Sequence, residues 1–153
     1  MLITPLQFLL IMLSVTAAAG VLQWMRTHRR AAALRRLAAA REMHFSADDR
    51  FRLAPRIASL LPVPGAASVR VGDLIYGIDH ENYRYVFSTE YTTGVLRTKT
   101  SVRRVATYCE PRDPAAAAAA RKRRCELVFA PEYLPLVEQY EHLLGGTSNT
   151  DRD

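Results

Sequence analysis

The first 25 residues carry no Asp, Glu, Lys or Arg. A helix rises about 1.5 Å per residue, so about 20 residues cross the roughly 30 Å hydrocarbon core of a bilayer. The run is apolar on every face, which does not suit a helix that buries only one side in a soluble core. Trp24 stands near its end, where interfacial aromatic side chains are common. We therefore predict a transmembrane anchor over residues 1–25.

The alternative for this run is an export signal, because Ala17-Ala18-Ala19 has the small-x-small form of a cleavage site. A secretory signal, however, carries its positive charge before the apolar run, whereas Arg26, Arg29 and Arg30 follow it. Arginines after an apolar segment tend to stay in the cytoplasm. We expect a retained single-pass anchor in a bacterial inner membrane, with the N-terminus outside and the C-terminal domain cytoplasmic; export after cleavage at 17–19 is the alternative.

The net charge of +6 is confined to one segment of the chain. Residues 26–41 hold six arginines and no acid, whereas residues 42–153 hold 15 basic and 15 acidic side chains. Because the remainder is neutral, we expect no nucleic-acid partner. The arginines set the orientation of the anchor, and they can also meet anionic lipid head groups at about 1 kcal/mol each. The candidate lipid contacts are Arg26, Arg29, Arg30, Arg35 and Arg36.

The segment that follows the anchor, residues 26–45, is rich in Ala, Arg and Leu and lacks Gly and Pro. This composition predicts that the helix continues past the membrane surface as an arginine-rich juxtamembrane stalk outside the core. Ser46, three residues before Asp49, has the form of a capping box and predicts a further helix, which Pro55 should interrupt.

A change of period then predicts strands at 69–77 and 83–91, joined in a hairpin by a polar turn. The second strand places its aromatic residues on one face, as in a half-buried antiparallel strand. Residues 102–110 and 125–131 read as two more strands. The fold class is therefore α+β, a small antiparallel sheet of about four strands packed with flanking helices, over residues 46–145. The expected aromatic face comprises Tyr83, Tyr85, Phe87, Thr89 and Tyr91.

The C-terminal third adds an insertion and a final helix. Asp113, Pro114 and six alanines predict a short exposed helix in an Ala/Arg-rich insertion at 113–124. A helix ending at Gly145 is predicted from an apolar face that comprises Tyr133, Leu136, Val137, Tyr140, Leu143 and Leu144. Residues 146–153 should form a disordered tail.

No motif in the chain predicts catalysis. Cys109 and Cys125 are each followed by a glutamate that points to the opposite strand face, and no histidine motif supports either thiol. No Cys or His pair has metal-ligand spacing, and Asp79-His80-Glu81 is a common composition for a solvated turn. We predict no catalytic residue, no cofactor and no metal. In the cytoplasm both cysteines should be reduced.

Three segments carry a resemblance: "GAASVRVGDLIYG", "YRYVFSTEYTTG" and "APEYLPLVEQY". They resemble parts of uncharacterised bacterial single-pass membrane proteins in which a short N-terminal helix precedes a small cytoplasmic α+β domain. The resemblance covers residues 42–145 and implies an architecture. It transfers no functional residues, and the alanine and arginine run at 115–124 departs from it.

These observations favour a membrane-anchored cytoplasmic domain that acts as a non-catalytic protein-interaction module near the inner membrane. Its expected partners are the lipid bilayer and a membrane-associated protein, whose effective concentration the anchor would raise. One alternative is an enzyme for a lipid or membrane-associated substrate, which would have to gather residues 79–81 in a pocket. The other is a sensor of anionic lipid surfaces built on the juxtamembrane arginines.

Overall fold

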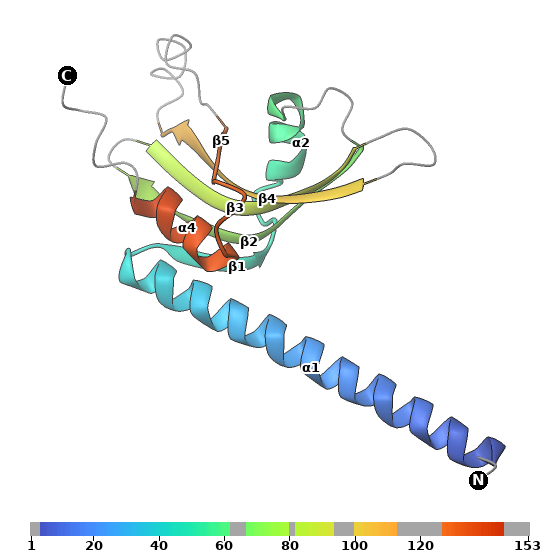
Figure 1. The fold of residues 1–153 in the computed structure, drawn as a ribbon. Coiled ribbons are helices and arrows are strands. Elements are labelled where there is room, and N and C mark those ends of the chain that lie inside the picture. Colours follow the sequence, from blue (N-terminus) through green and yellow to red (C-terminus); the bar gives the residue numbers. More distant parts are fainter. Residues whose placement is uncertain (1–3, 62–66, 80–81, 94–99, 113–126, 146–153) are drawn as a thin grey trace. The chain divides into compact units, whose positions relative to one another are not determined.

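The computed structural model describes residues 4–61, 67–79, 82–93, 100–112 and 127–145. The chain divides into two compact units, Met1–Ala33 and Leu34–Asp153, which are considered separately. The predicted insertion at 113–124, Cys125 and the predicted tail at 146–153 lie outside the described residues. The elements are α1 (Pro5–Ala40), β1 (His44–Asp48), α2 (Leu53–Ile57), the 3₁₀ helix η1 (Ala58–Leu60), β2 (Ala67–Asp79), β3 (Asn82–Thr93), β4 (Thr100–Pro111), β5 (Val128–Phe129) and α4 (Leu136–Gly145) (Figure 1).

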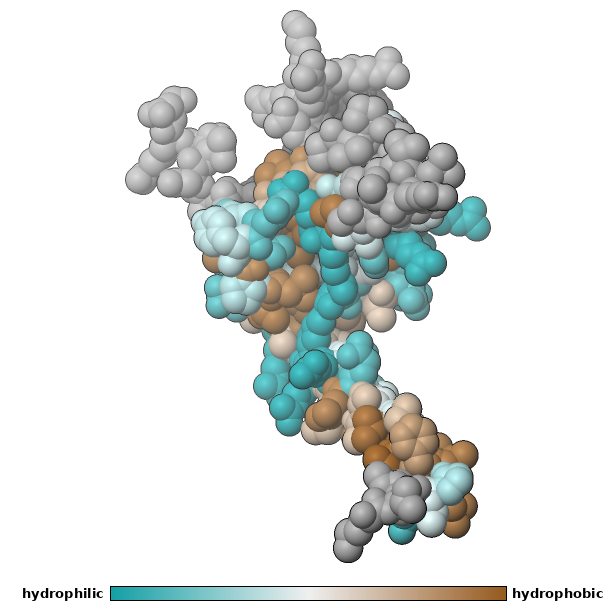
Figure 2. Space-filling model, turned by 45° about the vertical axis from the view of Figure 1, so that its right-hand side comes forward, coloured by the Kyte–Doolittle hydropathy of each residue, from teal (hydrophilic) through white to brown (hydrophobic). Residues whose placement is uncertain are grey.

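The first unit contains the apolar part of α1, and among the described residues α1 is the one helix long and apolar enough to cross a membrane. Its large apolar side chains are exposed, as the brown surface in Figure 2 shows. Two of its polar side chains bond to the helix itself: the Ser14 hydroxyl donates to Leu10 O at 2.9 Å and the Thr16 hydroxyl to Met12 O at 3.0 Å. Their polarity is thus satisfied without water.

The second unit is built on an antiparallel sheet in the order β1-β2-β3-β4-β5. The α+β class and the antiparallel arrangement are confirmed, with five strands instead of about four. The predicted hairpin is β2–β3, in which Ile78 pairs with Tyr83 and Tyr76 with Tyr85. β3 and β4 pair along their whole lengths, whereas β5 pairs only with Ala106 and Thr107.

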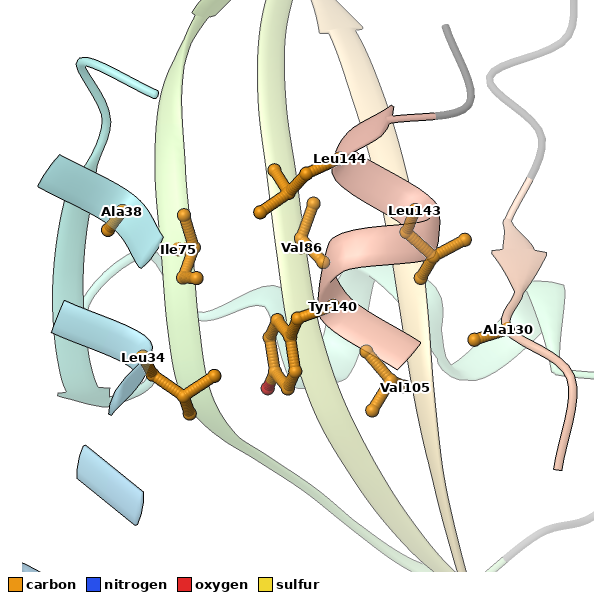
Figure 3. Packing of buried hydrophobic residues seen from close by; sticks show 9 residues of the cluster. All are labelled: Leu34, Ala38, Ile75, Val86, Val105, Ala130, Tyr140, Leu143 and Leu144. Atoms are coloured by element: carbon orange, nitrogen blue, oxygen red, sulfur yellow. The ribbon is translucent and has the colours of Figure 1, made fainter. Parts of the chain in front are cut away.

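Both faces of this sheet are covered, α2 packing on one and α4 on the other (Figure 1). The predicted alternation along β3 is confirmed, but the expectation that β3 is half-buried is wrong. Arg84, Val86 and Ser88 are buried on the face opposite the aromatic residues. The cluster on the α4 face comprises Leu34, Ala38, Ile75, Val86, Val105, Ala130, Tyr140, Leu143 and Leu144 (Figure 3). The cluster on the α2 face comprises Leu53, Ile57, Leu74, Tyr85, Phe87 and Ala106.

The end of α1 belongs to the second unit and to its core. Leu34 and Ala38 are fully buried against β2 and α4, one helical turn apart on the same face (Figure 3). The predicted continuation of the helix beyond residue 25 is therefore present, but the expectation that it stays outside the core is wrong for its last two turns. The compact unit begins at Leu34, upstream of the expected boundary at residue 46.

The predicted helix start at Ser46 is also wrong, because Ser46 lies in β1, paired with Leu74 of β2. The helix begins later, at Leu53. Asp49 nevertheless caps it: its carboxylate oxygens accept hydrogen bonds from the backbone N–H groups of Leu53 at 2.8 Å and Ala54 at 2.9 Å. The carboxylate satisfies two of the N–H groups that the first helical turn leaves without partners.

The last helix differs from the prediction at its start. α4 begins at Leu136, and Tyr133, which was placed on its apolar face, precedes it and is 84% exposed. Tyr140, Leu143 and Leu144 are buried as predicted, and the helix ends at Gly145.

Candidate functional site

The arginines predicted to contact lipid have different environments. In the first unit Arg26 and Arg29 are exposed and Arg30 is partly buried. In the second unit Arg35 and Arg36 are exposed. The guanidinium of Arg35 lies 5.6 Å above the centre of the Phe45 ring, a distance at which a cation and an aromatic ring attract each other. Arg35 therefore has a structural contact inside the domain besides any contact with lipid.

Two other arginines bind the C-terminal end of α4, where the helix leaves carbonyl groups without partners. The Arg41 guanidinium donates to Leu144 O at 3.2 Å. Arg84, which is 5% exposed, donates to Leu143 O and, at 3.3 Å, to the Asp79 carboxylate. Cations at this end of a helix also interact favourably with its dipole. Asp79 is thus in an ion pair, and the other two residues of the predicted polar turn, 80–81, lie outside the described residues.

A second polar group surrounds an irregular part of β2, where Asp73 has a positive φ of 49°. The Arg103 guanidinium donates to the Asp73 carboxylate at 3.0 Å and to the Ser88 hydroxyl at 3.3 Å, and the Tyr140 hydroxyl donates to Asp73 O at 2.7 Å. Ser88 donates in turn to Gly72 O at 3.0 Å. These contacts fix the bulge of β2.

The α2 face of the sheet carries an exposed aromatic and aliphatic surface at the end of the β2–β3 hairpin. We call it the hairpin surface and define it as Tyr76, Ile78 and Tyr83. Ile78 is 59% exposed and Tyr83 38% exposed, and their strand pairing brings them together. Tyr76, which is partly buried, lies two residues from Ile78 on the same face, and its ring centre lies 4.8 Å from that of Phe51. The alternation along 83–91 predicts Tyr83 on the aromatic face of the strand, and the structure leaves it 38% exposed on that face.

Beside this surface, Tyr85 is buried and stacks on Tyr108 at 6.3 Å between ring centres. Burial raises the pKa of the Tyr85 phenol above its ordinary value. Arg56 of α2 forms an ion pair with Glu110 of β4, and the hydrogen bond in this pair raises the pKa of the guanidinium. The pair joins α2 to the sheet above the two tyrosines.

Tyr85 should make the domain less stable at high pH. An unfolded tyrosine loses its proton near pH 10, but the folded state keeps Tyr85 protonated to a higher pH. The unfolded state then binds fewer protons, so the free energy of unfolding falls as the pH rises from about 10 through the raised pKa. We expect Tyr85→Phe to show a shallower fall between pH 9 and 11 in urea titrations. Tyr133→Phe, at an exposed position, should follow the unsubstituted chain; equal slopes for all three would contradict the assignment.

Within the part of the chain that the structure describes, no group of three or more His, Cys, Asp or Glu side chains is placed to hold a metal ion. No known protein family, curated protein or solved structure matches the chain.

Proposed function

We propose that this protein is a membrane-anchored, non-catalytic interaction module. Residues 1–25 would cross a bacterial inner membrane with the N-terminus outside, and the domain would bind a membrane-associated protein in the cytoplasm. The observation that carries the proposal is α1 itself. Its apolar N-terminal part is exposed, and its last two turns are part of the core of a folded domain. Exposed apolar surface of this extent favours a lipid environment.

The hairpin surface supports a protein partner. Tyrosine and large apolar side chains are enriched in the centres of protein interfaces, where they contribute much of the binding energy. Ile78 and Tyr83 are exposed, and Tyr85 and Tyr108 pack against each other beside them, so little ordering would be needed on binding. Anchoring would confine the domain and any membrane-bound partner to one surface, which raises their effective concentration.

Topology is the first test. A reporter active only in the cytoplasm and one active only outside are fused in turn after Asp153. We expect activity from the cytoplasmic reporter and a membrane-bound product of full length. Activity outside, with a product shortened by about 19 residues, would mean cleavage at 17–19. Cys109 and Cys125 would then be candidates for a disulfide, and the proposal would be wrong.

Partner binding is tested by position-specific crosslinking in intact membranes. A photo-reactive amino acid replaces Ile78 in one variant and Glu141, an exposed residue of α4, in a matched control. We expect a discrete crosslinked protein from position 78 and none from position 141. The same crosslinks from both positions, or none from either, would contradict binding through the hairpin surface.

A second candidate function is recognition of anionic lipid by the residues that follow the anchor. Arg26 and Arg29 are exposed and make no hydrogen bond or ion pair with any described residue. Each would contribute about 1 kcal/mol beside an anionic surface. Residues 26–153 are tested on vesicles with and without anionic lipid. Equal binding to both kinds of vesicle would exclude this function.

A further inference from the structure

The turn between β1 and α2 presents a phenylalanine between two arginines. Arg50, Phe51 and Arg52, called here the arginine turn, are all exposed. Phe51 is 39% exposed, and the rest of its ring packs against Tyr76 and Tyr85, at 4.8 and 5.5 Å between ring centres. The sheet therefore holds the ring in place while one part of it faces outward.

The two arginines of this turn make no side-chain hydrogen bond or ion pair with any described residue. Of the nearby acids, Asp49 uses both carboxylate oxygens to cap α2, while Asp48 is exposed and is the one acid of this region without a described side-chain partner. Most other described arginines of the domain have partners within it. These are Arg35, Arg41, Arg56, Arg84, Arg103 and Arg104.

The backbone of Arg52 is left-handed, with φ 52° and ψ 49°. A residue with a Cβ adopts this conformation rarely, and Gly or Asn would adopt it at lower cost. Backbone strain of this kind is concentrated at binding sites and turns, where the surrounding structure holds it in place. Here the Asp49 cap and the packing of Phe51 and Leu53 fix the residues on either side.

We propose that the arginine turn binds the anionic headgroup layer of the bilayer that holds α1. Arg50 and Arg52 would contact lipid phosphates, and the exposed part of the Phe51 ring would enter the interface between headgroups and acyl chains. This inference rests on the membrane anchor of the proposed function. The bilayer is favoured over an acidic protein because the anchor of the proposed function would keep the domain beside it, which raises the effective concentration of lipid around the domain.

Tryptophan fluorescence tests the contact in the full chain, reconstituted in nanodiscs that contain brominated lipid as a quencher. Trp24, the one tryptophan of the chain, reports on the anchor; a Trp24→Phe, Phe51→Trp variant reports on the turn. We expect the second reporter to be quenched in discs containing phosphatidylglycerol and much less in discs of phosphatidylcholine alone. The difference should shrink as salt is added.

Arg50→Gln with Arg52→Gln should lower the ratio of bound to unbound turn by roughly 25-fold, about fivefold for each arginine. Arg70→Gln with Arg112→Gln is the matched control, because both arginines are exposed and lie outside the turn. Equal quenching of the turn reporter in both kinds of disc, with Trp24 quenched, would overturn this inference and leave the anchor standing. An unquenched Trp24 would overturn both this inference and the membrane anchor of the proposed function. Crosslinks to an acidic protein that disappear with the two Gln substitutions, without any lipid dependence, would also exclude the bilayer.

Hydrogen exchange gives a second measurement without any substitution. The backbone N–H groups of residues 50–52 should exchange more slowly in discs containing anionic lipid than in zwitterionic discs, whereas those of β5 should not change. Equal exchange at residues 50–52 in the two kinds of disc would contradict the contact even if the Phe51→Trp variant folded poorly.

Discussion

Replacing Leu34 with alanine is expected to lower the free energy of unfolding of the domain by about 2–5 kcal/mol. Leu34 is fully buried in the cluster that contains Ile75 of β2 and Tyr140 of α4, although it lies on the helix whose N-terminal part is apolar and exposed. The substitution removes buried apolar surface and leaves a cavity that Tyr140 and Ile75 cannot fill without rearrangement. Urea titration of the full chain in detergent, followed by the circular dichroism of the sheet, would measure the change.

Leu22→Ala is the matched control, because it makes the same change in the same helix at an exposed position of the first unit. It should change the stability of the domain by no more than about 0.5 kcal/mol. A similar loss for both variants would mean that the loss does not come from burial of Leu34 in the domain, since alanine is no worse a helix former than leucine. No loss for either would show that burial of the Leu34 side chain contributes little to the stability of the domain.

Elements with a strong local signal were predicted well. The charge-free run at 1–25 indicated a membrane-length helix, and alternation along 83–91 gave the correct faces of β3. The hairpin β2–β3 followed from two strand patterns separated by a polar turn. Each of these signals depends on residues close together in the sequence, so no distant contact was needed to interpret it.

β1 is not predicted from the sequence, because the local pattern at residues 46–49 indicates the start of a helix. Ser46 and Asp49 have the spacing of a capping box, and pairing of residues 44–48 with β2 residues near Leu74 overrode it. The burial of both sheet faces was missed for a related reason. One face is covered jointly by Leu34, from near the start of the domain, and Tyr140, from near its end. Nothing in the sequence of β3 shows that these two helices meet over it.

The partners of the arginines at the candidate site could not be predicted from the sequence either. Charge counting grouped them correctly beside the apolar run, but it could not separate Arg35 and Arg41, which have partners in the domain, from Arg26 and Arg29, which have none among the described residues. The Arg41 partner is a carbonyl about 100 residues downstream, at Leu144. Likewise, the exposed arginine turn was hidden within a segment interpreted as a helix. Its strained backbone becomes visible only once the end of β1 is known.

Arg84→Met is expected to destabilise the domain by about 2–3 kcal/mol. Methionine occupies a similar volume but cannot donate to Leu143 O, and this carbonyl lies at a buried helix end. Substituting one partner of an ion pair is most harmful where the other charge stays buried. Asp79 is partly exposed and can bind water instead, so the cost comes mainly from the carbonyl. Arg84→Lys should be intermediate, because one ammonium replaces the planar fork that contacts both partners.

Arg103→Met provides the comparison, since Arg103 lies on the adjacent strand, is 46% exposed and pairs with Asp73. Ion pairs at such positions contribute about 1 kcal/mol or less, because water and salt screen them. Urea titrations should therefore rank the variants with Arg84→Met least stable and Arg103→Met closest to the unsubstituted chain. Equal losses of stability in the two variants would mean that burial of the Arg84 guanidinium does not increase its contribution to stability. An unchanged or increased stability of Arg84→Met would show instead that the C-terminal end of α4 finds other donors, with Arg41 the nearest candidate.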